Sequence, residues 1–216
     1  GHTLDIEVNH NINKADMDGD YRTKLGIDSD LLYQDGNNDK NTLSTINIDY
    51  VNPLNDHTKL ELGAEGRISR ADNNFSSNNP LIPTNQAAIA NKYDQDIFSS
   101  YATFGQTLGK FNYQVGTRVE SYKVDSKLDG TSTFKDDYVT LYPSVYVGYN
   151  LTESDMFNVS YSRRVDRPSV RQTSPVRQFS TPLMTMVGNP ELKPQFTNSV
   201  ELNYTRLFAK RSSITA

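Results

Sequence analysis

The sequence predicts an all-β protein, and more specifically about eight strands of an antiparallel up-and-down transmembrane β-barrel. Three observations lead to this prediction. Apolar side chains recur at every second position in a series of segments. The connections between these segments alternate between short and long along the whole chain. Aromatic side chains gather beside the short connections, as they do at the membrane surface in spanning barrels.

The alternation is clearest where Val115 and Val119 take turns with Gln114, Arg118 and Glu120. One face of such a strand is apolar, and the charged side chains keep to the other face. A lipid-facing surface requires this separation, because Arg or Lys at the bilayer midplane costs ~2–4 kcal/mol. The same pattern occurs in segments 113–120, 141–151, 157–162 and 200–205, and more weakly in 4–8, 46–50, 60–64 and 98–104.

The connections differ in length at the two ends of the predicted sheet. The short ones cover residues 52–56, 108–110, 152–155 and 209–211. The long ones cover residues 71–95, 125–137 and 168–195, and they are rich in Asn, Asp, Ser, Pro and Gly. Outer-membrane barrels have short periplasmic turns and long extracellular loops, whereas a soluble sandwich has no reason to keep its two ends so different. One short helix is expected within the first long connection, at 86–93.

Aromatic residues flank the short connections, and all but the pair at the edge of Gly109 fall on the apolar side of the strands. These residues are Phe104, Phe111, Tyr113, Tyr149, Phe157, Tyr204 and Phe208. They are expected to form a ring of aromatic side chains at the periplasmic membrane surface. The alternative is that cross-strand aromatic pairs stabilise a sheet of any kind.

The composition excludes several classes of protein. A net charge of −4 with a pI near 5.4 over 216 residues gives no basic surface for nucleic acid. With no cysteine, disulfide scaffolds, thiolate metal sites and cysteine nucleophiles are excluded. Hydrophobic residues make up only 35% and the mean hydropathy is −0.66, which is low for a soluble core. A barrel explains these values, because only alternate residues within a band about 25 Å tall meet lipid.

The two ends of the chain suggest a fragment. No apolar run reaches the ~18–20 residues of a transmembrane helix. The N-terminus enters alternating sequence directly, without the basic start and apolar stretch of a signal peptide. Residues 211–216 resemble the opening of a further strand. We therefore expect residues 1–216 to be part of one β-barrel domain that continues outside this chain.

Metal and catalytic chemistry have little support in the sequence. His2, His10 and His57 are scattered, without carboxylates at zinc-ligand spacing. Residues 16–20 and 35–39 begin like calcium loops, but glycine comes too early and no bidentate Glu follows, so they are expected to be solvated acidic turns. Nucleophile elbows, phosphate loops and zinc-hydrolase motifs are absent from the sequence. We expect no cofactor, no resident metal and no enzymatic activity.

Two paired motifs resemble a known family. Residues 161–168 read YSRRVDRP, and residues 188–197 read GNPELKPQFT. Upstream, residues 141–144 read LYPS, residues 149–152 read YNLT, and residues 116–120 read GTRVE. Together these segments resemble the barrel of TonB-dependent outer-membrane receptors, over residues 96–208 by motif and over the first ninety or so residues only by pattern.

The resemblance implies a receptor in a Gram-negative outer membrane that imports a scarce solute such as a glycan or a siderophore. The complete protein would have a plug domain inside the barrel. It would take energy from a TonB-type inner-membrane complex through a periplasmic segment. Neither the plug nor that segment is in this chain.

The motif residues have structural roles available. Pro168 can end a strand where ladder donors are no longer needed, and the second motif can form a rigid re-entry into the next strand. The residues assigned to this geometry are Pro168, Gly188, Asn189, Pro190, Lys193 and Pro194.

Four arginines fall in or near the last long connection: Arg164, Arg167, Arg171 and Arg177. Guanidinium groups can hold a carboxylate or phosphate of a solute by two hydrogen bonds. More often such arginines pair with acids of the barrel interior, here Glu120 and Glu201. The alternative to a transporter is a soluble β-sandwich adhesin or carbohydrate-binding module, which would bury the apolar face. An eight-stranded outer-membrane enzyme is a third class, but the sequence holds no identifiable catalytic constellation.

Overall fold

The computed structural model describes residues 1–24, 30–174, 178–181, 184–189, 191–208 and 212–215. Within this part of the chain, nine strands form one antiparallel sheet in which each strand pairs with the next along the chain, in the order β1-β2-β3-β4-β5-β6-β7-β10-β11. A separate hairpin consists of β8 and β9. The predicted antiparallel up-and-down architecture is confirmed, and the sheet is open rather than closed into a ring.

The strands of the main sheet are β1 (Thr3–Lys24), β2 (Asp30–Asn55), β3 (Thr58–Ser77), β4 (Ala88–Leu108), β5 (Phe111–Leu128), β6 (Thr131–Asn150), β7 (Asp155–Asp166), β10 (Gln195–Phe208) and β11 (Ser212–Thr215). Eight of them are long, as expected, and β11 confirms the strand predicted at the end of the chain. The hairpin strands are β8 (Gln178–Thr181) and β9 (Met184–Met186). The described helices are the single turns η1 (Thr84–Gln86) and α1 (Val170–Thr173), neither of which could cross a membrane.

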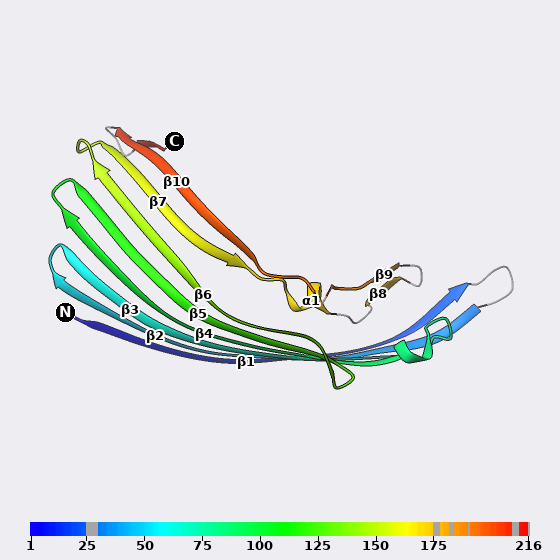
Figure 1. Cartoon of the computed structure of the whole chain (residues 1–216). Helices are drawn as coiled ribbons and strands as arrows, with labels where there is room; N and C mark the ends of the chain where they lie inside the picture. Colours follow the sequence, from blue (N-terminus) through cyan, green and yellow to red (C-terminus); the bar gives the residue numbers. More distant parts are fainter. Residues whose placement is uncertain (25–29, 175–177, 182–183, 190, 209–211, 216) are drawn as a thin grey trace.

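The sheet is curved, with β7 and β10 rising at one side and α1 with the β8–β9 hairpin lying above its concave surface (Figure 1). Alternate residues of each strand lie on opposite faces. In β5, Glu120 and Val124 lie on the inner face and are 1% and 0% exposed, whereas Val115 and Val119 lie on the outer face and are 49% and 43% exposed. The apolar parity predicted from the sequence is therefore the outer, exposed face of the sheet.

The short connections lie at one end of the sheet. They are the turns between β2 and β3, between β4 and β5, and between β6 and β7. The predicted turn at 209–211 lies outside the described residues. At the other end, the connection between β7 and β10 is long, as predicted, and it contains α1, β8 and β9.

Two of the long connections are shorter than predicted. The connection predicted at 71–95 covers only residues 78–87, because β3 and β4 extend further. The connection predicted at 125–137 is a two-residue turn in which Asp129 and Gly130 have φ of 49° and 81°. The prediction of a long loop at residues 125–137 is therefore wrong. Beyond the apolar band the outer face turns polar, and the apolar side chains that remain, such as Tyr122 and Val124, are buried on the inner face, so the alternation of the band does not continue in the sequence.

Two local predictions are also wrong for this reason. The helix expected at 86–93 is the end of η1 followed by β4. The acidic turns expected at 16–20 and 35–39 are strand segments of β1 and β2 that pair with each other. Their side chains bond across the strands: the Asn38 amide donates to Asp16, and Gln34 Nε2 donates to Asp20 over 2.7 Å.

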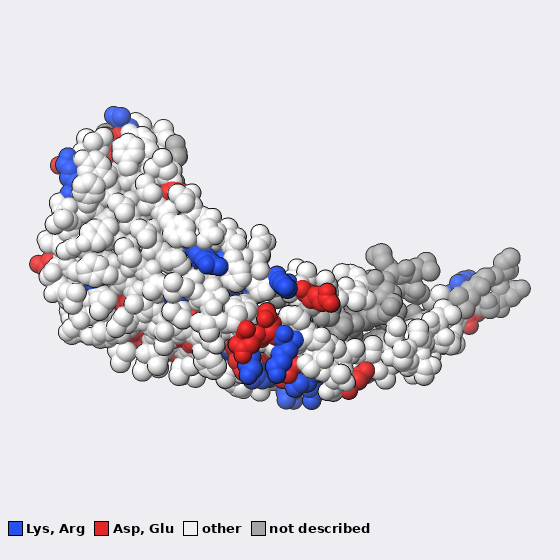
Figure 2. Space-filling view, viewed as in Figure 1, with Lys and Arg blue, Asp and Glu red and all other residues white. Residues whose placement is uncertain are grey.

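The outer face carries an apolar band of limited height. From the short turns outwards, the first charged side chain on the outer face of β1 to β6 is Lys14, Lys40, Arg70, Asp96, Lys123 and Asp137 in turn. Figure 2 shows the broad uncharged area next to the turns and the group of charged side chains beyond it.

The upper edge of this band crosses the strands at an angle. Registers across the sheet place Asp137 of β6 in the same row as Ser44 of β2, which is four residues from Lys40. Between β2 and β6 the edge of the band therefore shifts by four residues along the strands, or about 13 Å. The four strand spacings between them add up to about 19 Å, so the shift corresponds to a strand tilt of about 35°. Strands of transmembrane barrels tilt by ~35–45°.

Aromatic rings pair across strands on the outer face beside the short turns. Ring centroids are 4.7 Å apart for Phe111 and Tyr149, and 4.9 Å apart for Phe157 and Tyr204. These pairs lie at the lower edge of the apolar band, where an interfacial ring of aromatic side chains belongs.

The buried core lies on the opposite, inner face. Ala71, Tyr93, Ile97, Tyr122 and Val124 form its centre, at the end of the sheet away from the short turns. Partly buried Phe134, Tyr138 and Val170 pack against it. Val170 belongs to α1, so the core is formed where the long connection between β7 and β10 folds onto the sheet.

Candidate functional site

A buried ion-pair cluster on the inner face joins the sheet to the long connection. Glu120 of β5 is 1% exposed, and each of its carboxylate oxygens accepts a hydrogen bond from a different arginine. Arg118 comes from the same strand, whereas Arg167 immediately follows β7. Arg118 also lies 3.7 Å from Glu65 of β3. Arg167, the first residue after β7, is thereby held against the inner face of the sheet.

Three tyrosines of the wall complete the environment of Arg167. Its guanidinium carbon lies 4.7 Å from the centre of the Tyr122 ring. Its Nε donates to the Tyr138 hydroxyl over 3.3 Å, and its Nη2 donates to the Tyr142 hydroxyl over 3.3 Å. Burial acts to lower the pKa of Arg167, but these hydroxyls and the Glu120 charge outweigh it and raise the pKa above its ordinary value. Arg167 therefore stays cationic within the cluster.

The two ends of the long connection are fastened to each other. Ser169 and Gln172 form a capping box at the start of α1. At the far end, Gly188 N donates to Ser174 O over 2.9 Å, and Asn189 N donates to Gln172 O over 2.7 Å. A Cβ at position 188 would lie 2.6 Å from the carbonyl oxygens of Gln172 and Ser174, so only glycine fits there.

The second motif forms a turn beyond this contact. Asn189 Oδ1 accepts a hydrogen bond from Glu191 N over 2.9 Å, and Asn189 O accepts one from Leu192 N over 3.2 Å. Lys193 and Pro194 lead from this turn into β10, whose first residue is Gln195. Pro168 lies between the end of β7 and the cap of α1. Pro190 lies outside the described residues.

The candidate arginines are placed differently from one another. Arg164 lies on the inner-face parity of β7 and is exposed. Arg171 is an exposed residue of α1 whose Nη2 lies 3.9 Å from Met186 Sδ. Arg167 lies in the buried cluster, so the structure does not bring these three arginines to one point. Arg177 lies outside the described residues.

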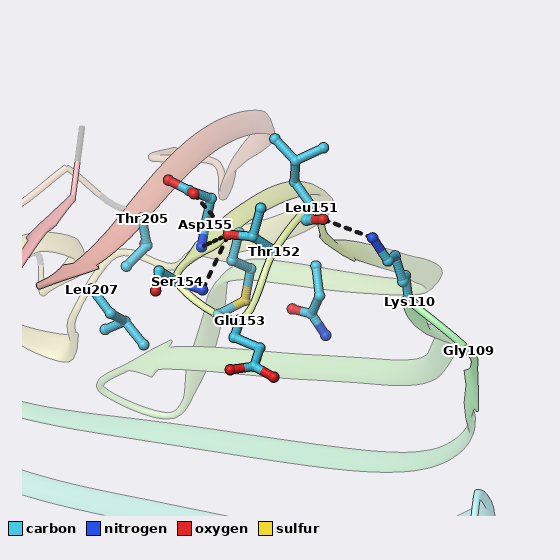
Figure 3. A pocket seen from close by; sticks show the side chains of 11 residues that line it. Gly109, Lys110, Leu151, Thr152, Glu153, Ser154, Asp155, Thr205 and Leu207 are labelled. Atoms are coloured by element: carbon cyan, nitrogen blue, oxygen red, sulfur yellow. Dashed lines mark hydrogen bonds between the residues drawn. The ribbon is translucent and has the colours of Figure 1, made fainter.

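A hollow lies at the opposite end of the sheet from the ion-pair cluster. It has a volume of about 650 Å³ and is lined by the β6–β7 turn and its neighbours (Figure 3). The Thr152 hydroxyl accepts hydrogen bonds from Ser154 N and Asp155 N, and Lys110 Nζ donates to Leu151 O over 2.8 Å. These contacts stabilise the turn itself. They leave the inner wall beneath the long connection as the stronger candidate site.

Several residues of the wall were not singled out from the sequence. Tyr122, Tyr138 and Tyr142 share the inner-face parity with Glu120, and this parity was a signal that could have identified them. The capping residues Ser169 and Gln172 could also have been found from their spacing before α1. The contact between Arg167 and Glu120 confirms, for this arginine, the pairing expected with acids of the barrel interior, although 47 residues separate the two.

Comparisons with known proteins agree with this architecture. A model of the outer membrane protein beta-barrel family matches residues 1–216. The same sequence finds no match among curated proteins.

Two solved structures are similar in fold. The ferric citrate transporter FecA in its unliganded form matches with a TM-score of 0.65 and 12% identity, over 95% of this chain and 30% of that chain. The copper transporter OprC matches with a TM-score of 0.57 and 12% identity, over 95% of this chain and 34% of that chain. The chain thus spans about a third of the length of each of these transporters.

Proposed function

Because the chain belongs to the outer membrane protein beta-barrel family and lies in the outer membrane, we propose that it forms part of the wall of a TonB-dependent receptor that imports a scarce solute. The observation that carries this proposal is the long connection between β7 and β10, which folds over the inner face and is tied to it by Arg167 and Glu120. A connection held in this way narrows the external mouth of a pore, where a receptor would meet its solute.

The solute is proposed to be a molecule such as a glycan or a siderophore that carries an anionic group. Arg164 and Arg171 are exposed at the inner side and in α1, and their guanidinium groups suit a carboxylate or phosphate. Arg177 is proposed to act with them. Arg167 is already engaged by Glu120, so its proposed role is to position the connection.

The energy for uptake is proposed to come from a TonB-type inner-membrane complex. The plug domain and the coupling segment would be supplied by parts of the protein outside this chain. The chain itself is proposed to have no enzymatic role and no cofactor. The two similar structures are named as transporters, which supports a role in transport rather than in catalysis.

A soluble β-sandwich adhesin is the alternative, and the sheet disfavours it. A sandwich would cover the apolar face with a second sheet. In the described part of the chain, the outer face of the one large sheet is uncovered, with Val200 and Leu202 exposed by 73% and 71%.

Uptake measurements test the proposal. Radiolabelled solutes from panels of glycans, siderophores and metal chelates would be offered to cells that produce the protein and to cells that also lack the energy-coupling complex. We expect one class to accumulate only when the complex is present. Equal accumulation in both strains would contradict active uptake, because passive diffusion needs no coupling.

Arg164→Ala tests the proposed solute contact. A hydrogen-bonded charge pair contributes ~1.5–3 kcal/mol, so affinity for the transported solute should fall by about tenfold or more. Arg70→Ala is the matched control, because Arg70 lies on the outer face and pairs with Asp94 and Asp96. Unchanged affinity in Arg164→Ala would remove Arg164 from the site.

A further inference from the structure

The edge of the apolar band is not uniform around the sheet. At the β4 to β6 side, the first charged residues on the outer face are Asp96, Lys123 and Asp137, which lie opposite one another in one row with alternating sign. At the β1 to β2 side, they are Lys14 and Lys40, which lie directly opposite each other. The first charged residues therefore alternate in sign on one side, whereas on the other side two like charges lie next to each other.

The Lys14–Lys40 pair places like charges on neighbouring strands. Like charges directly opposite each other in a sheet are destabilising. Both side chains are exposed, and among the described residues neither ammonium group has a carboxylate within 4.0 Å.

The nearest outer-face acids are already engaged. Asp16, one outer-face position beyond Lys14, accepts a hydrogen bond from Asn38. Asp72, opposite Lys40 on β3, lies 3.7 Å from Lys92 instead.

The position of Lys14 and Lys40 relative to the apolar band indicates which part of the membrane lies beside them. Ile12 is the last apolar outer-face residue of β1, and Lys14 follows it on the same face. In the proposed function, on which this inference rests, the side of the sheet with the long connection faces the cell exterior. The two ammonium groups therefore lie at the level of the headgroups of the outer leaflet, where lipid phosphates are found.

We propose that Lys14 and Lys40 bind a phosphate group of a lipid headgroup in the outer leaflet. Their side chains leave adjacent positions of β1 and β2, so both ammonium groups can reach one phosphate, which removes their mutual repulsion. This binding site is on the outer face and is separate from solute uptake.

Native mass spectrometry of the intact protein in detergent tests this proposal. The protein would be incubated with a phosphorylated disaccharide glycolipid, with the same glycolipid after removal of its phosphates, or with phosphatidylglycerol. The wild type is expected to retain the phosphorylated glycolipid, and Lys14→Glu/Lys40→Glu should retain about tenfold less or lower, given the attraction of each lysine for anionic headgroups.

Lys123→Glu is the matched control, because Lys123 lies at the same edge but between two acids. The Lys123→Glu variant should retain the phosphorylated glycolipid as the wild type does. If the double Glu variant fails the heat-modifiability test for a folded barrel, Lys14→Gln/Lys40→Gln takes its place. Equal retention by wild type and double variant, equal retention of the dephosphorylated glycolipid, or retention of phosphatidylglycerol alone would each overturn the proposal.

Discussion

At the scale of single residues, Glu120 connects the sheet to the long connection. It is buried between Arg118 and Arg167, one from its own strand and one from beyond β7. A buried carboxylate needs such partners, because an unpaired buried charge costs several kcal/mol. The hydrogen bond from Arg167 also fixes where the connection leaves the wall.

Replacing Arg167 by Met should loosen the long connection without unfolding the sheet. The change removes one charged partner of Glu120 and the hydrogen bonds to Tyr138 and Tyr142, which should cost about 2 kcal/mol in the free energy of local opening. Hydrogen exchange of the α1 amides measures this. Glu120→Gln completes a double-mutant cycle, in which a coupling energy near zero would show that the two side chains do not stabilise each other.

Gly188 is the second residue on which this arrangement depends. Gly188→Ala places a methyl group against the carbonyl oxygens of Gln172 and Ser174, and should break the two backbone hydrogen bonds at a cost of about 2 kcal/mol. The amides of residues 188 and 189 should then exchange faster. Gly105→Ala is the control, since the nearest atom to its Cβ would belong to the movable Lys59 side chain at 3.4 Å, and the nearest backbone atom would lie at 3.9 Å. Unchanged protection in Gly188→Ala would contradict this account.

At the scale of elements, the strands extend well beyond the apolar band. β5 and β6 continue past Lys123 and Asp137 to a two-residue turn with positive φ at both positions. Asp129 also bonds to Ala90 of β4 by two hydrogen bonds of 2.8 Å, so the tip of this hairpin is held against its neighbour.

Gly130→Val should destabilise this hairpin tip. A β-branched residue at φ +81° is strained, and the cost should be about 1–2 kcal/mol. Limited proteolysis between residues 126 and 133 should become faster. Asp129→Asn serves as the comparison, because Asn accepts positive φ at the first position of such a turn. If both variants resist protease as the wild type does, the turn is not the constraint that holds the tip.

The membrane-spanning part of each element could be predicted from the sequence, and the extracellular part could not. Between Phe111 and Val119, one face meets lipid and the other does not, so residues alternate visibly. Beyond Ser121, the outer face turns polar while Tyr122 and Val124 are buried on the inner face, so the alternation seen in residues 111–119 does not continue. The polar runs at 16–20 and 125–137 therefore look like loops although they form strands. At the candidate site, the alternation predicted that Glu120 lies on the inner face. Its contact with Arg167 forms only when the long connection folds back onto the sheet.

At the scale of the whole molecule, the open sheet has two edges, formed by β1 and β11. Transmembrane sheets close, because unpaired backbone groups cannot meet lipid. We therefore expect both edges to pair with further strands of one barrel domain, and a plug to fill its interior.

We expect the outer face of this sheet to meet lipid and the inner face to be shielded from it. Because the chain has no cysteine, single Cys substitutions at successive positions 113–120 of the intact protein in vesicles can each carry a nitroxide spin label. Paramagnetic relaxation by oxygen, which concentrates in lipid, should be high at positions 113, 115, 117 and 119 and low at positions 114, 116, 118 and 120. Relaxation without this period of two, or with the opposite phase, would contradict the account.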